Sequence, residues 1–506
     1  MTINVYADAL RAVSTCKRTE NGANAFSTTN DAVVDLFGTI GAMRNGDNSM
    51  ERVKEKVDAA WAEDPQLTMR CIFYARDIRG GLGEREIFRK AIYHLAKTHP
   101  TEMAKNMPLI PEYGRWDDLF SLIGTPVEDS MWLFVKGQLR EDTRKVSVTA
   151  PQGGSISLLA KWMPSADTSS KRTRELAFYA ADKLGMSVYA YKRYIRNLRR
   201  HLRLLEQDMS AKNWKEIDYR QLPSQAHMRH VKAFHRNDGE RYESYLDAVD
   251  KGVVKVNTQT LYPYEIVERI KDDRRYGFWV ADKDTVRAME TMWKNLPDYV
   301  GDGGNVLVVA DTSGSMMGRP MDISTSLAIY FAERNKGPFA EMYMTFSDKP
   351  QVIQLKNGDS LLDRYEQMIK GPWGQNTDLY RVFDFLIYIA TQTKCPPEEM
   401  PKAVVIITDM EIDRCERTGQ AEWNTIVDQV REYYEHVGYR MPNVVFWNVA
   451  SRHDTYLARC DYEGVQMVSG SSASVFKAVL GFIDGMTPIE AVRQVLDGER
   501  YRQITV

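Results

Sequence analysis

Asp311, Ser313 and Ser315 stand on alternate positions directly after the apolar run at residues 306–310. The carboxylate and the two hydroxyls lie on one turn of chain, so they can converge on a hard cation. Mg²⁺ takes about six oxygen ligands in octahedral geometry and keeps several of them as water. The apolar run is typical of a buried strand. The pattern therefore indicates a site for Mg²⁺, or another divalent cation, at the end of a strand.

Two further oxygen-bearing residues follow later elements in the same half of the chain. Thr377 precedes the helix that we expect at residues 379–391, and Asp409 follows the strand that we expect at 403–407. Ligands of open α/β sheets gather beyond the carboxyl ends of the strands, so both side chains are expected beside Asp311. The predicted metal ligands are Asp311, Ser313, Ser315, Thr377 and Asp409.

Two alternatives remain for these residues. Residues 311–315 taken alone are also typical of a helix N-cap, because Asp and Ser accept hydrogen bonds from free N–H groups. A magnesium hydrolase is the other alternative, but its site is usually built of carboxylates around two metals. The sequence holds no G-x-S-x-G elbow and no credible Cys/His arrangement for nucleophilic catalysis. We therefore expect a binding protein and not an enzyme.

The second candidate site is a cluster of cations. Residues 151–200 carry ten Lys and Arg but three Asp and Glu, in a chain whose net charge is −2. In the helix expected at 188–207, basic residues share a face and are interleaved with Tyr189, Tyr191 and Tyr194. Basic groups neutralise phosphates and tyrosines can stack on unpaired bases. The alternative is a solvated helix face whose Tyr and Leu residues pack inward. The predicted RNA-binding residues are Lys161, Lys171, Arg172, Arg174, Lys192, Arg193, Arg196, Arg199, Arg200 and Arg203.

Two halves of different character must position these residues. Up to about residue 300 the apolar residues recur at helical spacing, as in the helices expected at 50–63, 67–78 and 87–96. Consecutive helices with short connections indicate a stack of helical pairs. After the turn-rich stretch 298–304, short β-branched runs alternate with helices, which predicts a parallel, doubly wound sheet. The expected fold class is α + α/β.

The charge divides at the same boundary. Residues 1–300 carry a net charge of +6 and residues 301–506 a net charge of −8. This excludes a uniformly basic coating protein and permits a localised anion-binding surface. We expect a helical-repeat domain over 1–300 and an α/β domain over 301–486. A C-terminal helix and tail over 487–506 are expected to pack back on the helical domain.

Composition excludes several protein classes. The chain has 506 residues, of which 43% are hydrophobic and 27% charged, so it can bury a sizeable core. No apolar run approaches the roughly 18 residues that a membrane span needs, and the N-terminus lacks a signal-peptide pattern. Five scattered cysteines argue against a disulfide framework and for a reducing compartment. We expect a cytoplasmic protein with no membrane partner.

The metal-site pattern resembles a known family. D-x-S-x-S, then a threonine, then an aspartate after a strand is similar to the metal-ion-dependent adhesion site of von Willebrand factor type A domains. The resemblance implies that Ser313 and Ser315 ligate the metal directly and Thr377 directly or through water. It implies that Asp311 and Asp409 act largely through water. An open coordination position would then accept an acidic group from a partner protein.

The helical half resembles a second family. Residues 75–85 (ARDIRGGLGER) and 111–119 (PEYGRWDDL) are similar to segments of TROVE-type proteins, and residues 408–411, 445–448 and 468–470 extend the resemblance over most of the chain. The Ro/TROVE architecture implies a ring of HEAT-like helical repeats coupled to a type A domain. It implies RNA as the partner, with single-stranded 3′ ends in a central hole and small structured RNAs on an outer basic surface.

RNA binding without DNA specificity is therefore expected, together with an acidic protein group at the metal site. The alternative is a protein-interaction scaffold, in which the metal captures a partner's carboxylate and the helices bind no RNA. The surroundings of the basic band at residues 161–203 distinguish the RNA-binding hypothesis from the scaffold hypothesis. A band that lines an open groove favours RNA, and a band paired with acids favours the scaffold.

Overall fold

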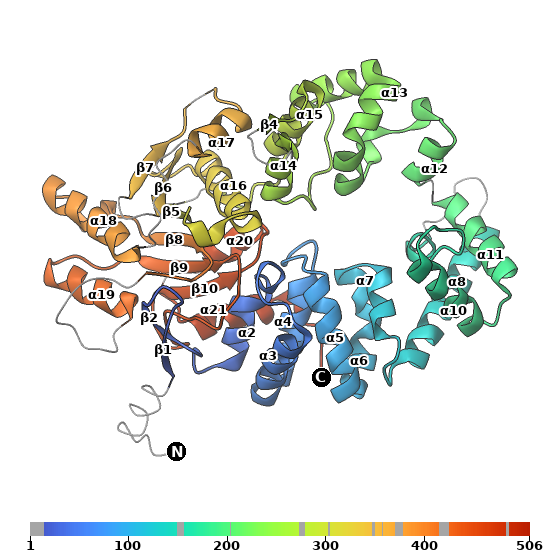
Figure 1. Cartoon of the computed structure of the whole chain (residues 1–506), viewed down its shortest axis with the longest axis horizontal. Helices are drawn as coiled ribbons and strands as arrows, with labels where there is room; N and C mark the ends of the chain where they lie inside the picture. Colours follow the sequence, from blue (N-terminus) through green and yellow to red (C-terminus); the bar gives the residue numbers. More distant parts are fainter. Residues whose placement is uncertain are drawn as a thin grey trace.

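A helical part is followed by an α/β part, in agreement with the predicted α + α/β class (Figure 1). The structure is a computed structural model, and it describes residues 15–148, 156–202, 204–272, 279–301, 304–346, 350–356, 358–369, 378–413, 425–481 and 485–506.

Local signals in the sequence set the ends of the helices. α3 spans Met50–Glu63, as predicted, because the N-cap Ser49 accepts a hydrogen bond from the Arg52 N–H. Asp64 caps the next helix in the same way, and Pro65 occupies its first turn. The helices of this part are α2 (Ala32–Ile40), α3, α4 (Pro65–Arg76), α5 (Glu86–Thr98), α6 (Pro100–Asn106), α7 (Ile110–Tyr113), α8 (Glu128–Val148), α9 (Leu159–Trp162), α10 (Lys171–Lys183), α11 (Val188–His201), α12 (Leu205–Ser210), α13 (Ser224–Asp250), α14 (Pro263–Ile270) and α15 (Lys283–Lys294).

The helix predicted over 188–207 is two helices in the structure. α11 ends at His201 and α12 begins at Leu205, with extended backbone at Leu204 between them. The last turn of α11 carries Arg199, Arg200 and His201. Positive charge stabilises the negative end of the helix dipole, which favours a helix end at this point.

The α/β part is built on a six-stranded sheet with the strand order β10-β9-β8-β5-β6-β7. All neighbours from β10 to β6 pair in parallel. The strands are β5 (Val306–Asp311), β6 (Met342–Phe346), β7 (Gln351–Gln354), β8 (Ala403–Thr408), β9 (Asn443–Asn448) and β10 (Val465–Ser469). The helices are α16 (Arg319–Arg334), α17 (Leu361–Ile369), α18 (Leu379–Thr393), α19 (Ile426–His436), α20 (Val475–Leu480) and α21 (Pro488–Leu496).

The sheet is mixed, and the expectation of a wholly parallel sheet is wrong at its edge. β7 pairs antiparallel with β6. The chain between Phe346 and Gln351 is too short for a crossover, and such a link can join only antiparallel neighbours. β7 leaves little trace in the sequence, because it is four residues long and its sequence, QVIQ, does not alternate between apolar and polar residues.

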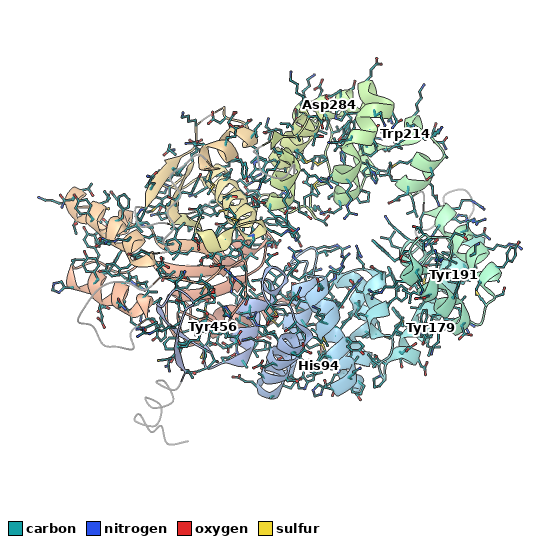
Figure 2. All side chains as sticks on the ribbon, viewed as in Figure 1. His94, Tyr179, Tyr191, Trp214, Asp284 and Tyr456 are labelled. Atoms are coloured by element: carbon teal, nitrogen blue, oxygen red, sulfur yellow. The ribbon has the colours of Figure 1, made fainter. Side chains whose placement is uncertain are left out.

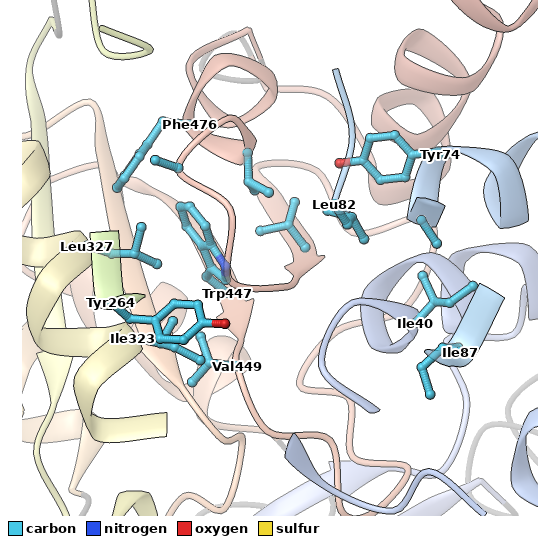
Figure 3. Packing of buried hydrophobic residues seen from close by; sticks show 14 of the residues in the cluster. Ile40, Tyr74, Leu82, Ile87, Tyr264, Ile323, Leu327, Trp447, Val449 and Phe476 are labelled. Atoms are coloured by element: carbon cyan, nitrogen blue, oxygen red, sulfur yellow. The ribbon is translucent and has the colours of Figure 1, made fainter. Parts of the chain in front are cut away.

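The N-terminal segment packs on the sheet that forms at the other end of the chain. α2 lies against β10, and the backbone of Phe26 bonds that of Tyr456. Gly41 is needed at this contact, because a Cβ there would lie 2.8 Å from the Ser469 carbonyl oxygen. Figure 3 shows Ile40 and Ile87 of the helices on one side of this region and Trp447 and Val449 of the α/β part on the other, all within one cluster of buried residues. The helical and α/β parts therefore share one continuous core.

The helices form an arc that leaves the sheet at α2 and returns to it at α14 (Figure 1). α14 packs against α16, which follows the first strand of the sheet. Arg44, just after α2, joins both ends of the arc to the sheet: it donates to the Tyr264 hydroxyl of α14 at 3.1 Å and to the Ser471 hydroxyl at 3.2 Å. Among the described residues, no helix is long and apolar enough to cross a membrane.

The C-terminal segment is fastened to the first helices. α21 packs against α4. Beyond it, Arg500 donates to both carboxylate oxygens of Asp77, and the Tyr501 hydroxyl donates to the same carboxylate at 3.0 Å. The Asp77 side chain is fully buried.

We expect Asp77→Asn to lower the free energy of unfolding by about 2–3 kcal/mol, because it removes the buried charge that pairs with the partly exposed Arg500. Chemical denaturation measures the effect, and limited proteolysis should release the C-terminal segment. Asp497→Asn is the matched control, since this carboxylate is 50% exposed where it pairs with Arg70 and should cost under about 1 kcal/mol. Equal losses in the two variants would contradict the expectation.

Candidate functional site

Asp311 and Asp409 lie at the carboxyl edge of the sheet, where the sequence pattern predicted them. Asp311 ends β5, and Asp409 directly follows β8, the parallel neighbour of β5. The register pairs Ala310 with Ile407, so the two strands end side by side. Both carboxylates are buried. Two acids thus meet in a region that water barely reaches.

Hydroxyl groups surround the Asp311 carboxylate. It accepts hydrogen bonds from the Ser313 N–H at 2.9 Å and from the Thr408 hydroxyl at 2.6 Å. The Ser313 and Ser315 hydroxyl oxygens lie 3.0 Å apart. The residues of the D-x-S-x-S string therefore converge, as expected, and Thr408 is an additional member.

An arginine neutralises one of the two acids. The Arg452 guanidinium forms an ion pair with Asp409 and donates to the Ser315 carbonyl at 3.3 Å. Its Nε is buried without a hydrogen-bond partner in the part of the chain that the structure describes. Asp311 accepts no bond from a cation among these residues. Burial, and then the Asp409 charge, raise the pKa of Asp311.

Thr377, the fifth predicted ligand, lies outside the described residues. The other four are brought together at one edge: Asp311, Ser313, Ser315 and Asp409. Carboxylate and hydroxyl oxygens are the donors that Mg²⁺ prefers. A divalent cation here would also relieve the cost of two buried carboxylates, of which Asp409 alone pairs with a cation among the described residues. The residues present therefore fit a hard divalent cation, with Arg452 as its internal competitor.

A second acidic group adjoins this edge. One ligand atom each from Glu20, Glu411 and His453 lie within 4.8 Å of one another. The Glu411 N–H donates to Asp409 at 3.2 Å, and the Glu20 N–H donates to the Glu411 carboxylate at 2.7 Å. These bonds tie the N-terminal segment to the edge of the sheet.

The second predicted site contains a pocket of about 500 Å³, in the part of the arc that lies farthest from the sheet (Figure 1). Figure 2 shows Tyr191, which lines it, on the opposite side of the molecule from Tyr456. The wall comes from α9, α11, α12 and the turn after α9. Four predicted cations line the pocket: Lys161, Lys192, Arg196 and Arg199.

Three of these cations have partners inside the protein. Lys192 Nζ lies 2.5 Å and an Arg196 guanidinium nitrogen 3.9 Å from the Asp167 carboxylate. Arg199 donates to the backbone carbonyls of Ala160 at 2.8 Å and Met163 at 2.5 Å. Burial lowers the pKa of Arg199.

Five other predicted cations lie on the helices around the pocket. Lys171 faces Glu175 at 3.8 Å, and Arg174 donates to the Thr168 carbonyl at 2.8 Å. Three are exposed and form no ion pair with any residue that the structure describes: Arg172, Arg193 and Arg200. Arg203 lies outside the described residues.

The tyrosines of α11 divide by exposure. Tyr191 is buried and donates to the Pro164 carbonyl at 2.7 Å, and the Tyr194 hydroxyl donates to the Leu139 carbonyl at 2.9 Å. Both pack inward, as in the alternative of a solvated helix face. Tyr189 is 76% exposed. It remains available for stacking on a base.

Sequence reasoning missed Thr408, Arg452 and Asp167. The polar pair Thr408–Asp409 at a strand end was a usable signal, because both follow the same apolar run. Arg452 and Asp167 carry no motif of their own, and their places depend on how distant segments pack.

We expect Arg452→Met to lower the free energy of unfolding by about 3 kcal/mol at pH 8 in EDTA, because it leaves Asp409 buried without a cation. The double variant Arg452→Met/Asp409→Asn should recover most of this loss. Chemical denaturation of both variants measures the difference. A double variant no more stable than the single one would contradict this account of the pair.

Comparison with known proteins identifies the family to which this chain belongs. Residues 19–137 and 132–306 match the model of a domain of unknown function (DUF2828), and residues 305–503 match that of another (DUF7788). The chain is 30% identical over 518 residues to the uncharacterized protein L728 of Acanthamoeba polyphaga mimivirus, an alignment that covers 95% of this chain and 87% of the viral protein. Because the first model matches more than half of the chain and this similarity runs along nearly all of it, the chain belongs to the DUF2828 family.

Proposed function

We propose that this chain is an RNA-binding protein of Ro/TROVE type, which holds single-stranded ends or structured small RNA on the basic helices α9–α11. One observation carries the proposal: four separately predicted cations line a single pocket. Three exposed arginines without a described ion-pair partner lie on the same helices: Arg172, Arg193 and Arg200.

The charge around the pocket suits a polyanion. Residues 151–200 hold a net charge of +7 in a chain of net charge −2. Each phosphate that a Lys or Arg neutralises releases condensed counterions, which drives binding and makes it salt-dependent. The exposed ring of Tyr189 adds a stacking surface for an unpaired base.

In this proposal residues 1–300 form the helical-repeat, HEAT-like TROVE domain and residues 301–486 a von Willebrand factor type A domain. The return of α14 to α16 supports a ring closed by the α/β part. The packing of α21 on α4 supports residues 487–506 as a segment that docks on the helices.

The type A domain of the proposal binds Mg²⁺. Asp311, Ser313, Ser315, Thr377 and Asp409 would hold the ion directly or through water. When bound, it would offer a positive charge to a carboxylate of a partner protein. No catalytic step is assigned to it.

One observation favours a second candidate, a protein-interaction scaffold without RNA. Asp167 already pairs with Lys192 and Arg196, so part of the pocket's charge is neutralised within the protein. A scaffold would keep such pairs as structural contacts, whereas an RNA-binding surface would exchange them for phosphate.

Mg²⁺ at ten times its dissociation constant should raise the free energy of unfolding by about 1.4 kcal/mol. Asp311→Asn should abolish this gain, because it removes a buried oxygen anion from the donor set. Arg452→Met should shift the midpoint to a lower Mg²⁺ concentration, since it removes the competing cation. Thermal unfolding against Mg²⁺ concentration measures all three.

Glu398→Gln is the control for the magnesium experiment, because this side chain is exposed and the residue lies at the opposite edge of the sheet, where Asn305 before β5 donates to its carbonyl. It should respond to Mg²⁺ as the unmodified chain does. A gain in stability that survives Asp311→Asn would place the ion elsewhere.

For RNA, the triple variant Arg172→Ala/Arg193→Ala/Arg200→Ala should weaken the binding of a single-stranded oligonucleotide at least tenfold. The slope of log affinity against log salt should fall by about 0.7 for each phosphate that is no longer neutralised. Fluorescence anisotropy at several salt concentrations measures both quantities.

The control for the RNA experiment removes three other exposed cations, all on or after α13: Arg229, Lys251 and Lys255. This variant has the same net charge as the triple arginine variant, so it separates a local site from overall charge. Equal weakening in both variants would refute a site on α9–α11, and failure of the unmodified chain to bind RNA would refute the function.

A further inference from the structure

We propose that the pocket between α9, α11 and α12 binds a single nucleotide through a terminal phosphate monoester, either at the end of an RNA or on a free mononucleotide. The inference rests on the proposed function for its RNA source, and on the pocket itself for its ligand chemistry. The volume of about 500 Å³ falls within the roughly 300–1,000 Å³ of small-molecule sites. It has room for one nucleotide rather than for a strand.

The place of the phosphate is marked by an internal anion. The Asp167 carboxylate lies between Lys192 Nζ and the Arg196 guanidinium, at 2.5 and 3.9 Å. These three side chains are 56%, 34% and 68% exposed, so the carboxylate can swing into solvent without disturbing the core. Two cations on successive turns of α11 thus hold one exchangeable anion.

The charge of the ligand decides which phosphate displaces Asp167. A phosphate monoester carries about −1.5 to −2 at pH 7 and three acceptor oxygens. A carboxylate carries one negative charge, and so does each phosphodiester inside a strand. A phosphate monoester therefore competes better than a phosphodiester for the place of the Asp167 carboxylate between the two cations. Lys161, which forms no ion pair with the described residues, lines the same pocket and can add a third contact.

The remaining wall fits the rest of a nucleotide. Pro164, Ile195 and Leu204 give an apolar surface for a base. On α12, Glu206, Gln207 and Ser210 supply acceptors and donors for ribose hydroxyls and base edges.

Arg199 positions this wall. It ties α11 to the carbonyls of Ala160 and Met163, so the two cations that face Asp167 are held at a fixed distance from α9.

Titration calorimetry with AMP and adenosine tests the pocket alone. AMP should bind and adenosine should bind at least tenfold more weakly, because the phosphate makes charge-assisted bonds. Asp167→Asn should tighten AMP binding about two- to fivefold by removing the competing anion, and Lys192→Ala should weaken it tenfold or more. Glu175→Gln, which removes a paired surface acid outside the pocket, should leave AMP binding unchanged.

Anisotropy with one RNA sequence ending in 5′-phosphate, 3′-phosphate or hydroxyl groups separates the two sources of the phosphate. Tighter binding of a phosphorylated RNA, increased by Asp167→Asn, supports an RNA end. AMP binding without RNA binding would support the inference that the pocket binds a phosphate monoester, and it would overturn the proposed function. RNA binding that ignores the terminal phosphate, with no AMP binding, overturns this inference and leaves the proposed function standing.

Discussion

The arrangement of the molecule depends on the contact between α3 and the loop at residues 450–454. Arg52 of α3 donates to the Ser451 carbonyl at 2.5 Å, to its hydroxyl at 2.8 Å and to Asp454 at 2.9 Å. The Asp47 N–H donates to the same carbonyl at 3.0 Å. Gly46 must lack a side chain, because a Cβ there would lie 2.1 Å from that oxygen. The first helices are therefore fixed on the sheet at the loop that carries Arg452.

This contact links the helical part to the candidate metal site. Arg452 reaches Asp409 from a loop whose neighbouring residues are held by α3. A cation that displaced Arg452 would act on a segment bonded to the helices. The two proposed sites are nevertheless separate, since the metal site lies at the sheet and the pocket is formed where the arc is farthest from the sheet (Figure 1). The basic pocket suits the proposed nucleic acid, and the acidic edge of the sheet suits the proposed divalent cation.

Patterns within one element could be read from the sequence, because they depend on periodicity and on the residues at element ends. The ends of α3 were predicted to the residue, and Asp311 and Asp409 were predicted at the ends of the correct strands. What depends on distant packing could not be read. Arg452 is 43 residues from Asp409, and Thr408 is 97 residues from Asp311. Whether Tyr191 would stack on a base or pack inward was left open by the sequence, and the fold turns it inward.

Crosslinking of a 4-thiouridine-labelled single-stranded RNA, followed by mass spectrometry of the linked peptides, tests the central claim most directly. Crosslinks should concentrate in peptides from residues 156–210, which contain α9 to α12. Crosslinks confined to the α/β part, or none above the level of an unlabelled control, would contradict RNA binding at these helices.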